Sequence, residues 1–229
     1  IIWAAIEQQY DLMIEKKGGV KLRQLDETRE ALGKKLRSEK NPSISLDELF
    51  QVVQWKFGKG KARHALWKHL KSIQQKDLDD FSKESFQKAN SGDVKGAIEI
   101  LAKLSGVGPA TASAILSIYR PDFFSFMDDE VIEALNEDKK RGYTVNIYLE
   151  VNSKCQEIAR TLGWSCNRVG RALWTASQIL ATGGEDLTIS AKGNGSELSS
   201  SSTTRKHKRP PREENDATIG SDVTRIRKK

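Results

Sequence analysis

The sequence predicts an all-α globular domain over residues 1–182, followed by a disordered tail over residues 183–229. Apolar residues recur at helical spacing, three or four positions apart, through the first part. All sixteen aromatic residues also lie there, whereas the tail holds a run of serine and threonine and scattered charges. A segment of that composition cannot bury enough apolar surface to offset the entropy lost on ordering, so we expect disorder.

The N-terminal part of the domain has helical stripes separated by breaks. Gly18-Gly19, Asn41-Pro42 and Gly58-Lys59-Gly60 interrupt the apolar pattern. Ser45-Leu46-Asp47-Glu48 is a capping box, in which a hydroxyl and a carboxylate satisfy free amides at the start of a helix. We expect helices over residues 3–14, 25–36, 45–57, 62–73 and 77–89.

In the C-terminal part, side chains that cap helices mark where helices begin. Asp93 precedes one helix, and Asp128 or Asp129 precedes a short one. Residues 142–151 alternate like a strand, but a single strand would have no partner in a helical chain, so we expect a helix there. Ser165 then caps the final helix.

The most informative stretch is Leu104-Ser105-Gly106-Val107-Gly108-Pro109-Ala110-Thr111-Ala112, which lies between two helical stripes. Glycine takes positive φ and leaves the backbone accessible, and proline suits the first position of a helix. We expect a tight hairpin with Val107 in the core. The amides of Gly108, Ala110 and Thr111 would then bind an anion, with the Thr111 hydroxyl as a further contact. The alternative is an ordinary turn in which glycine closes the first helix.

This stretch resembles the helix-hairpin-helix motif. With the later segment Phe126-Met127-Asp128-Asp129-Glu130-Val131, residues 93–135 resemble the helix-hairpin-helix DNA glycosylases, which include endonuclease III. The resemblance implies that Gly106, Val107, Gly108, Pro109, Ala110 and Thr111 form a contact with the DNA backbone that does not read base sequence. It also implies a monovalent cation held by hairpin carbonyls, as in many members, and no other cofactor.

The resemblance further implies an aspartate that assists cleavage of the bond between base and sugar. Asp128 and Asp129 both match its spacing from Ala110, and the two alternatives stay open. Such a carboxylate stabilises a sugar cation or activates water, whereas the simpler interpretation is a helix cap. Bifunctional members carry a Schiff-base lysine where this chain has Ala110, so an enzyme of this type would be a monofunctional glycosylase.

A second basic segment precedes the hairpin in the sequence. The formal net charge is +7, and Lys59, Lys61 and Arg63 lie beside two glycines without nearby acidic residues. We expect these three side chains to contact DNA. The aromatic residues around them, Trp55, Phe57 and Trp67, are expected in the core.

Other features limit the function classes. Two cysteines cannot form a disulfide framework or hold an iron–sulfur cluster by themselves. No histidine has metal-ligand spacing to them, so no metal site is predicted. No apolar run approaches the roughly 20 residues that span a bilayer, so no membrane partner is expected. In the tail, Arg205-Lys206-His207-Lys208-Arg209-Pro210-Pro211-Arg212 resembles a nuclear-import signal, which predicts a nuclear protein. The alternative interpretation of this basic cluster is a solvated run of charges or an additional non-specific contact with phosphate.

The sequence therefore leaves three hypotheses. The first is a DNA-binding protein that is glycosylase-like without established turnover. The second is an active monofunctional DNA glycosylase in base excision repair that uses Asp128 or Asp129. The third is a protein-interaction scaffold whose hairpin only packs. The sequence predicts no particular protein partner.

Overall fold

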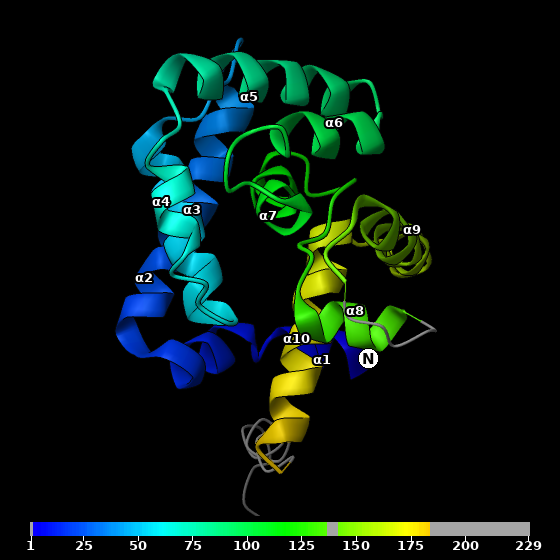
Figure 1. Ribbon diagram of the computed structural model, residues 1–229. Helices are drawn as coiled ribbons and strands as arrows, with labels where there is room; N and C mark the ends of the chain where they lie inside the picture. Colours follow the sequence, from blue (N-terminus) through cyan, green and yellow to red (C-terminus); the bar gives the residue numbers. More distant parts are fainter. Residues whose placement is uncertain (1, 137–141, 184–229) are drawn as a thin grey trace, which may run out of the picture. The chain divides into compact units, whose positions relative to one another are not determined.

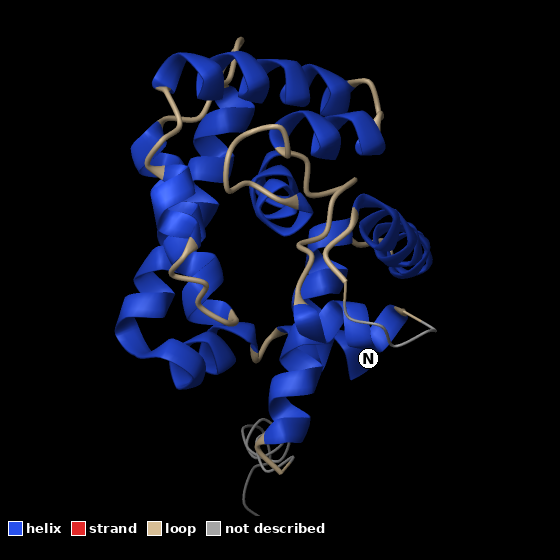
Figure 2. Ribbon diagram, in the orientation of Figure 1, coloured by secondary structure: helices blue, strands red, loops and turns tan. Residues whose placement is uncertain are grey.

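Ten helices make up the regular structure of the described residues, and no strand occurs among them (Figure 2). The computed structural model describes residues 2–136 and 142–183. The prediction of an all-α fold is confirmed. The helices are α1 Ile2–Glu7, α2 Tyr10–Ser38, α3 Leu46–Lys59, α4 Leu66–Leu70, α5 Gln75–Asn90, α6 Val94–Leu101, α7 Pro109–Tyr119, α8 Asp129–Leu135, α9 Val145–Leu162 and α10 Cys166–Ala181.

Helix α7 is the central element of this fold, with α3, α6 and α9 around it (Figure 1). Every residue from Ala110 to Tyr119 is buried, because this helix is apolar or small on all sides. Its serines satisfy neighbouring polar groups. The Ser113 hydroxyl accepts a hydrogen bond from the amide of Met127 at 2.9 Å, which fixes the segment before α8 against the first turns of α7.

A buried polar network joins α2 to α3 and α7. One carboxylate oxygen of Asp26 accepts hydrogen bonds from the Tyr10 hydroxyl at 2.9 Å and from the Trp55 indole at 2.6 Å. The Arg29 guanidinium donates to the Ser117 hydroxyl at 2.7 Å and lies 3.9 Å from the centre of the Trp55 ring. Buried polar groups of this kind are costly unless paired, so the network fixes how the three helices meet.

Several helix starts agree with the expected caps. The Ser45 capping box is present in full, Asp93 accepts from the amide of Gly96 at 2.8 Å, and Ser165 caps α10. Residues 145–162 form α9, capped by Thr144. The prediction of a helix rather than a strand there is confirmed.

Two helix boundaries differ from the prediction. The break at Gly18-Gly19 is a kink inside α2, where Gly19 has φ of +65°, and the helix resumes at once instead of near residue 25. The helix expected over residues 62–73 is only Leu66–Leu70. Its flanks are tight turns, such as the bond from the Leu66 amide to the Arg63 carbonyl at 2.9 Å. Turns closed by a hydrogen bond to the carbonyl three residues earlier replace regular helix here.

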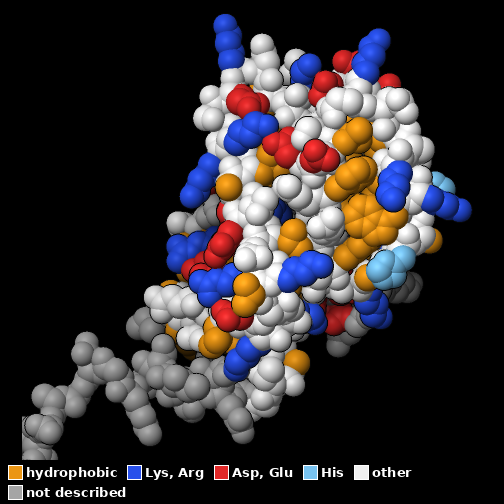
Figure 3. All heavy atoms as spheres, turned by 90° about the vertical axis from the view of Figure 1, so that its left-hand side faces the viewer, with side chains coloured by type: hydrophobic (Ala, Val, Ile, Leu, Met, Phe, Trp, Pro, Cys, Tyr) orange, Lys and Arg blue, Asp and Glu red, His pale blue; other side chains and the backbone are white. Residues whose placement is uncertain are grey.

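The aromatic side chains divide between core and surface. Trp55 and Trp174 are fully buried, whereas Phe57 and Trp67 are only partly buried. Their rings lie edge to face with centres 5.7 Å apart and line a groove between α2, α3 and α4. Figure 3 shows hydrophobic side chains gathered on this side of the molecule, beside lysine and histidine.

None of the helices in residues 2–136 and 142–183 combines the length and apolar character needed to cross a bilayer. The predicted disordered tail beyond Gly183, with the basic cluster at residues 205–212, lies outside the described residues.

Candidate nucleic-acid interface

The hairpin between α6 and α7 has the tight geometry that its glycines predict. Gly106 has φ of +78°, and the Val107 amide donates to the Leu104 carbonyl at 3.0 Å. A Cβ atom at Gly106 would lie 3.0 Å from Cβ of His69 and 3.2 Å from the amide nitrogen of Leu70. Both the positive φ and the contact with α4 therefore require glycine. Val107 is buried, as expected.

The start of α7 leaves two amides free. Within the described chain, the amides of Gly108 and Ala110 donate no hydrogen bond. Gly108 is exposed, and a Cβ atom there would meet nothing within 4 Å. These amides lie at the positive end of an eleven-residue helix, where an anion binds favourably. The Thr111 amide differs from our expectation, because it donates to the Gly108 carbonyl at 2.9 Å.

Lys56 adds an amine to this corner. Its Nζ donates to the Thr111 hydroxyl at 3.0 Å, and the side chain is half-buried at the end of α3. Burial, together with the nearby Arg63 charge, lowers the pKa of Lys56 to about 8, although Asp129 and Asp128 oppose the shift. Lys56 was not among the predicted site residues. A signal existed, because Lys56 and Lys59 continue the apolar stripe of Leu49 and Val52 at helical spacing.

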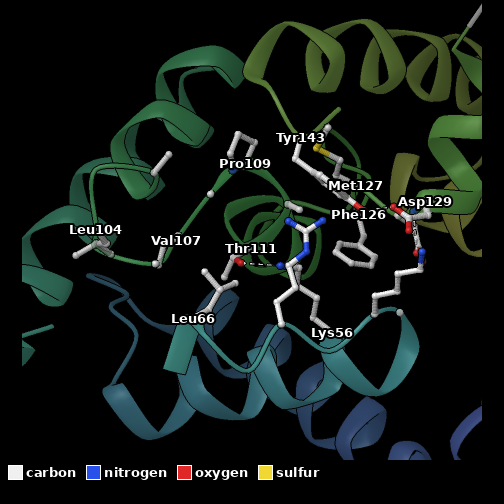
Figure 4. A pocket seen from close by; sticks show the side chains of 18 residues that line it. Lys56, Leu66, Leu104, Val107, Pro109, Thr111, Phe126, Met127, Asp129 and Tyr143 are labelled. Carbon is white, nitrogen blue, oxygen red and sulfur yellow. Dashed lines mark hydrogen bonds between the residues drawn. The ribbon is translucent and has the colours of Figure 1, made fainter. Parts of the chain in front are cut away.

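A pocket of about 340 Å³ opens in front of the hairpin (Figure 4). The hairpin and the first turn of α7 form one wall, and the end of α3 with the residues after it forms another. The segment from Phe126 to Asp129 and the side chain of Tyr143 close the remaining side. The volume falls at the lower end of the range found for small-molecule sites.

The structure separates the two candidate aspartates. Asp128 is the N-cap of α8 and is only 4 % exposed. The Oδ2 atom of Asp128 lies 2.8 Å from Nζ of Lys59, so the two side chains form an ion pair. Within the described residues this oxygen accepts no well-aligned hydrogen bond. Asp129 is partly buried, lines the pocket and accepts a hydrogen bond from the Tyr143 hydroxyl.

Lys59 corrects one of our expectations. We predicted that it contacts DNA, but only 3 % of it is exposed. Its Nζ lies 4.4 Å from the ring centre of Trp174 and 5.3 Å from that of Phe126, beside Asp128. Burial lowers the pKa of Lys59, opposed by the Asp128 charge. The physical reason is packing, since the last turn of α3 faces the core and a nearby carboxylate compensates the charge.

Lys61 and Arg63 remain available. Both are exposed and line the mouth of the pocket. The Arg63 guanidinium stacks 4.5 Å from the centre of the Tyr143 ring. Burial, followed by the bond to Asp129, raises the pKa of Tyr143 to about 12. Tyr143 therefore keeps its proton at neutral pH and donates it to the Asp129 carboxylate.

Behind Asp128 lies a third acidic group, Glu130. Burial, followed by the Asp128 charge, raises the pKa of Glu130 to about 7. The amide of Gln178 donates to one of its oxygens at 2.9 Å. Two carboxyls at the start of α8 share this region with one buried ammonium, Lys59, so repulsion favours protonation of Glu130.

No cluster of metal-ligating side chains occurs among residues 2–136 and 142–183. Cys155 and Cys166 are buried and unbridged. The pocket brings together free backbone amides, the exposed cations Lys61 and Arg63, and the partly buried side chains of Lys56 and Asp129.

Comparison of the chain with protein-family models, with curated proteins and with solved structures finds no match. The class defined by fold and site is accordingly an all-α protein with a glycine hairpin beside a pocket that holds basic and acidic side chains.

Proposed function

We propose that this chain binds the phosphate backbone of DNA through the hairpin at residues 104–111. The observation that carries the proposal is the pair of amides at Gly108 and Ala110 that donate no hydrogen bond within the described chain. Gly108 lies at an open surface, whereas the Ala110 residue is 5 % exposed. Exposed Lys61 and Arg63 lie on the opposite wall of the same pocket. Amides and cations arranged in this way contact phosphate without reading bases.

A substitution at Gly108 tests the proposal without disturbing the fold. Gly108 has φ of −100°, and its Cβ would meet no neighbour within 4 Å. Gly108→Glu therefore places a carboxylate where the phosphate would bind, and Gly108→Ala is the matched control. We expect Gly108→Glu to lower duplex affinity at least tenfold in fluorescence anisotropy, with an unchanged circular dichroism spectrum. If Gly108→Glu binds the duplex with unchanged affinity, the hairpin does not bind phosphate, and only the scaffold hypothesis remains for it.

A second candidate function is base excision, favoured by the Asp129 carboxylate in the pocket. A partly buried carboxylate beside a space of this size can stabilise a sugar cation, once a base leaves the stack. Asp129→Asn should abolish base release from a panel of damaged duplexes while it leaves duplex binding intact. Asp128→Asn tests the alternative aspartate. Absence of abasic product with the unsubstituted protein across the panel would rule this candidate out for those lesions.

The proposal extends to a nuclear location, which the basic cluster at residues 205–212 favours. A fusion of the full chain to a fluorescent protein should accumulate in nuclei. The same fusion without residues 205–212 should be distributed evenly. Equal distribution of both fusions would contradict a nuclear-import signal in this cluster.

A further inference from the structure

The groove between α2, α3 and α4, here called the aromatic groove, is a second open cavity, with a volume of about 370 Å³. Buried Leu22 forms part of its floor. A Cβ atom at Gly58 would lie 2.7 Å from a methyl carbon of Leu22, and one at Gly18 would lie 2.5 Å from Cβ of Leu22. A side chain at either position would clash with Leu22, so glycine at both positions helps to keep this floor in place.

Two aromatic side chains supply most of the remaining apolar surface of the aromatic groove. Phe57 from α3 and Trp67 from α4 both line it, and both are only partly buried (Figure 3). The Trp67 ring meets Phe50 as well as Phe57 edge to face, with centres 5.8 Å and 5.7 Å apart. Rings held in this way form a pre-organised platform, on which a planar ring can stack at a low cost in conformational entropy.

The polar side chains of the aromatic groove suit an anionic partner. Lys21 and His64 are exposed and line it, and no Asp or Glu occurs among the described residues that do so. Gln54 adds an exposed amide, which can both donate to and accept from the edge of a base. Aromatic rings among basic side chains are typical of surfaces that bind single-stranded nucleic acid.

The segment over residues 60–67 separates the aromatic groove from the hairpin pocket. Its Lys61 and Arg63 line the pocket. Its His64 and Trp67 line the aromatic groove. The two cavities therefore share a wall, and one DNA strand can contact both.

We propose that the aromatic groove binds unpaired bases of DNA, so that the protein prefers a duplex that continues into a single strand over a blunt duplex. The inference rests on the proposed function, because the hairpin holds the duplex part of such a substrate. It adds the substrate class, which is a junction between double-stranded and single-stranded DNA. The hairpin alone contacts phosphates, which both forms of DNA carry.

Fluorescence anisotropy with the full chain and three DNA probes tests the inference. The first probe is a blunt duplex, and the second carries an unpaired tail of about ten nucleotides, at the 5′ or the 3′ end in separate samples. The third carries the same tail without its bases. Because the third probe keeps the phosphates, it separates stacking from charge.

Trp67→Leu removes the stacking ring and keeps an apolar side chain. Trp3→Leu is the matched control, because Trp3 is also partly buried but packs against Trp164 and does not line the aromatic groove. We expect at least one tailed duplex to bind fivefold or more tightly than the blunt duplex, since one stacked base contributes about that much. The tail without bases and Trp67→Leu should both lose this preference, and Trp3→Leu should retain it.

Two exposed lysines of α2 provide a second pair of variants, in case Trp67→Leu loses its helical circular dichroism. Lys21 lines the aromatic groove, whereas Lys34 does not. Lys21→Glu should at least halve the preference for the tailed duplex, and Lys34→Glu should leave the preference unchanged. Equal effects of the two lysine variants on the preference would overturn the inference.

Other results separate this inference from the proposed function. Equal affinity for the blunt and tailed duplexes overturns the inference alone, and it is the result expected if the aromatic groove instead binds a protein. A preference that persists in a folded Trp67→Leu, or with the tail that lacks bases, also overturns it. If the unsubstituted protein binds none of the probes, the proposed function fails and this inference fails with it.

Discussion

Removal of the Lys59 ammonium should destabilise the protein strongly. Lys59 and Asp128 are 2.8 Å apart, and their side chains are 3 % and 5 % exposed. At an effective dielectric constant of about 20, Coulomb attraction at this distance is about 6 kcal/mol. Desolvation costs several kcal/mol for each ion, so the intact pair adds little net stability. Breaking it is different, because one charge then remains buried alone.

Lys59→Met keeps the apolar stem inside its ring of aromatic side chains and leaves the Asp128 carboxylate without its cation. We expect a loss of about 3–5 kcal/mol in the free energy of unfolding. Urea titration at pH 7, followed by tryptophan fluorescence and by circular dichroism, measures it. The reporters are well placed, since Trp55 and Trp174 both adjoin Lys59.

The double variant Lys59→Met with Asp128→Asn removes both charges and keeps a side chain that can cap α8. It should recover at least half of the loss, and Lys61→Met at an exposed position should change stability by less than about 0.5 kcal/mol. A loss below about 1 kcal/mol in Lys59→Met, or a double variant no more stable than the single one, would refute the reasoning.

Three further predictions follow from the same geometry. Gly106→Ala should cost about 1–3 kcal/mol in urea titration, because of the positive φ and the 3.0 Å contact with His69; a neutral result would mean that the hairpin is mobile. Glu130, with its pKa raised to about 7, holds a proton in the folded state that the unfolded chain has lost, so stability should fall as pH rises from about 4.5 to 7; Glu130→Gln should flatten that slope and add about 1 kcal/mol at pH 8, after discount for partial exposure. The pKa of Lys56, lowered to about 8, should appear in a proton titration of its side-chain carbon resonances; a value near 10.5 would contradict its burial.

Local sequence signals predicted the elements that depend on near neighbours. The helix caps and the hairpin are set by residues within one or two turns, so Ser45, Asp93 and Gly106 could be placed from their context. The sequence predicts a helix end at Gly18-Gly19, but the structure has a kink at Gly19 inside α2 and an immediate return to helix. Leu22, in the first turn after the kink, is buried and lies against Gly58 of α3, a contact between residues far apart in the sequence.

The lysines of α3 could not be placed from local signals alone. Lys59 is buried because Asp128, far along the chain, packs beside it, and such a pairing depends on the tertiary fold. Charge patterning favoured solvent for both Lys56 and Lys59, whereas helical spacing from Leu49 favoured the interior. The structure agrees with the helical spacing: Lys59 is buried and Lys56 is partly buried. Of these two lysines, Lys56 lines the pocket and Lys59 does not.

The most direct test of the hairpin as a phosphate grip is an amide chemical-shift titration of the labelled protein with a short duplex. The account predicts the largest shifts at the amides of Gly108 and Ala110, with smaller ones at the Lys61 and Arg63 backbone, and their loss in Gly108→Glu. If the Gly108 and Ala110 resonances stay in place while amides on other surfaces shift, the hairpin is not the phosphate-binding site.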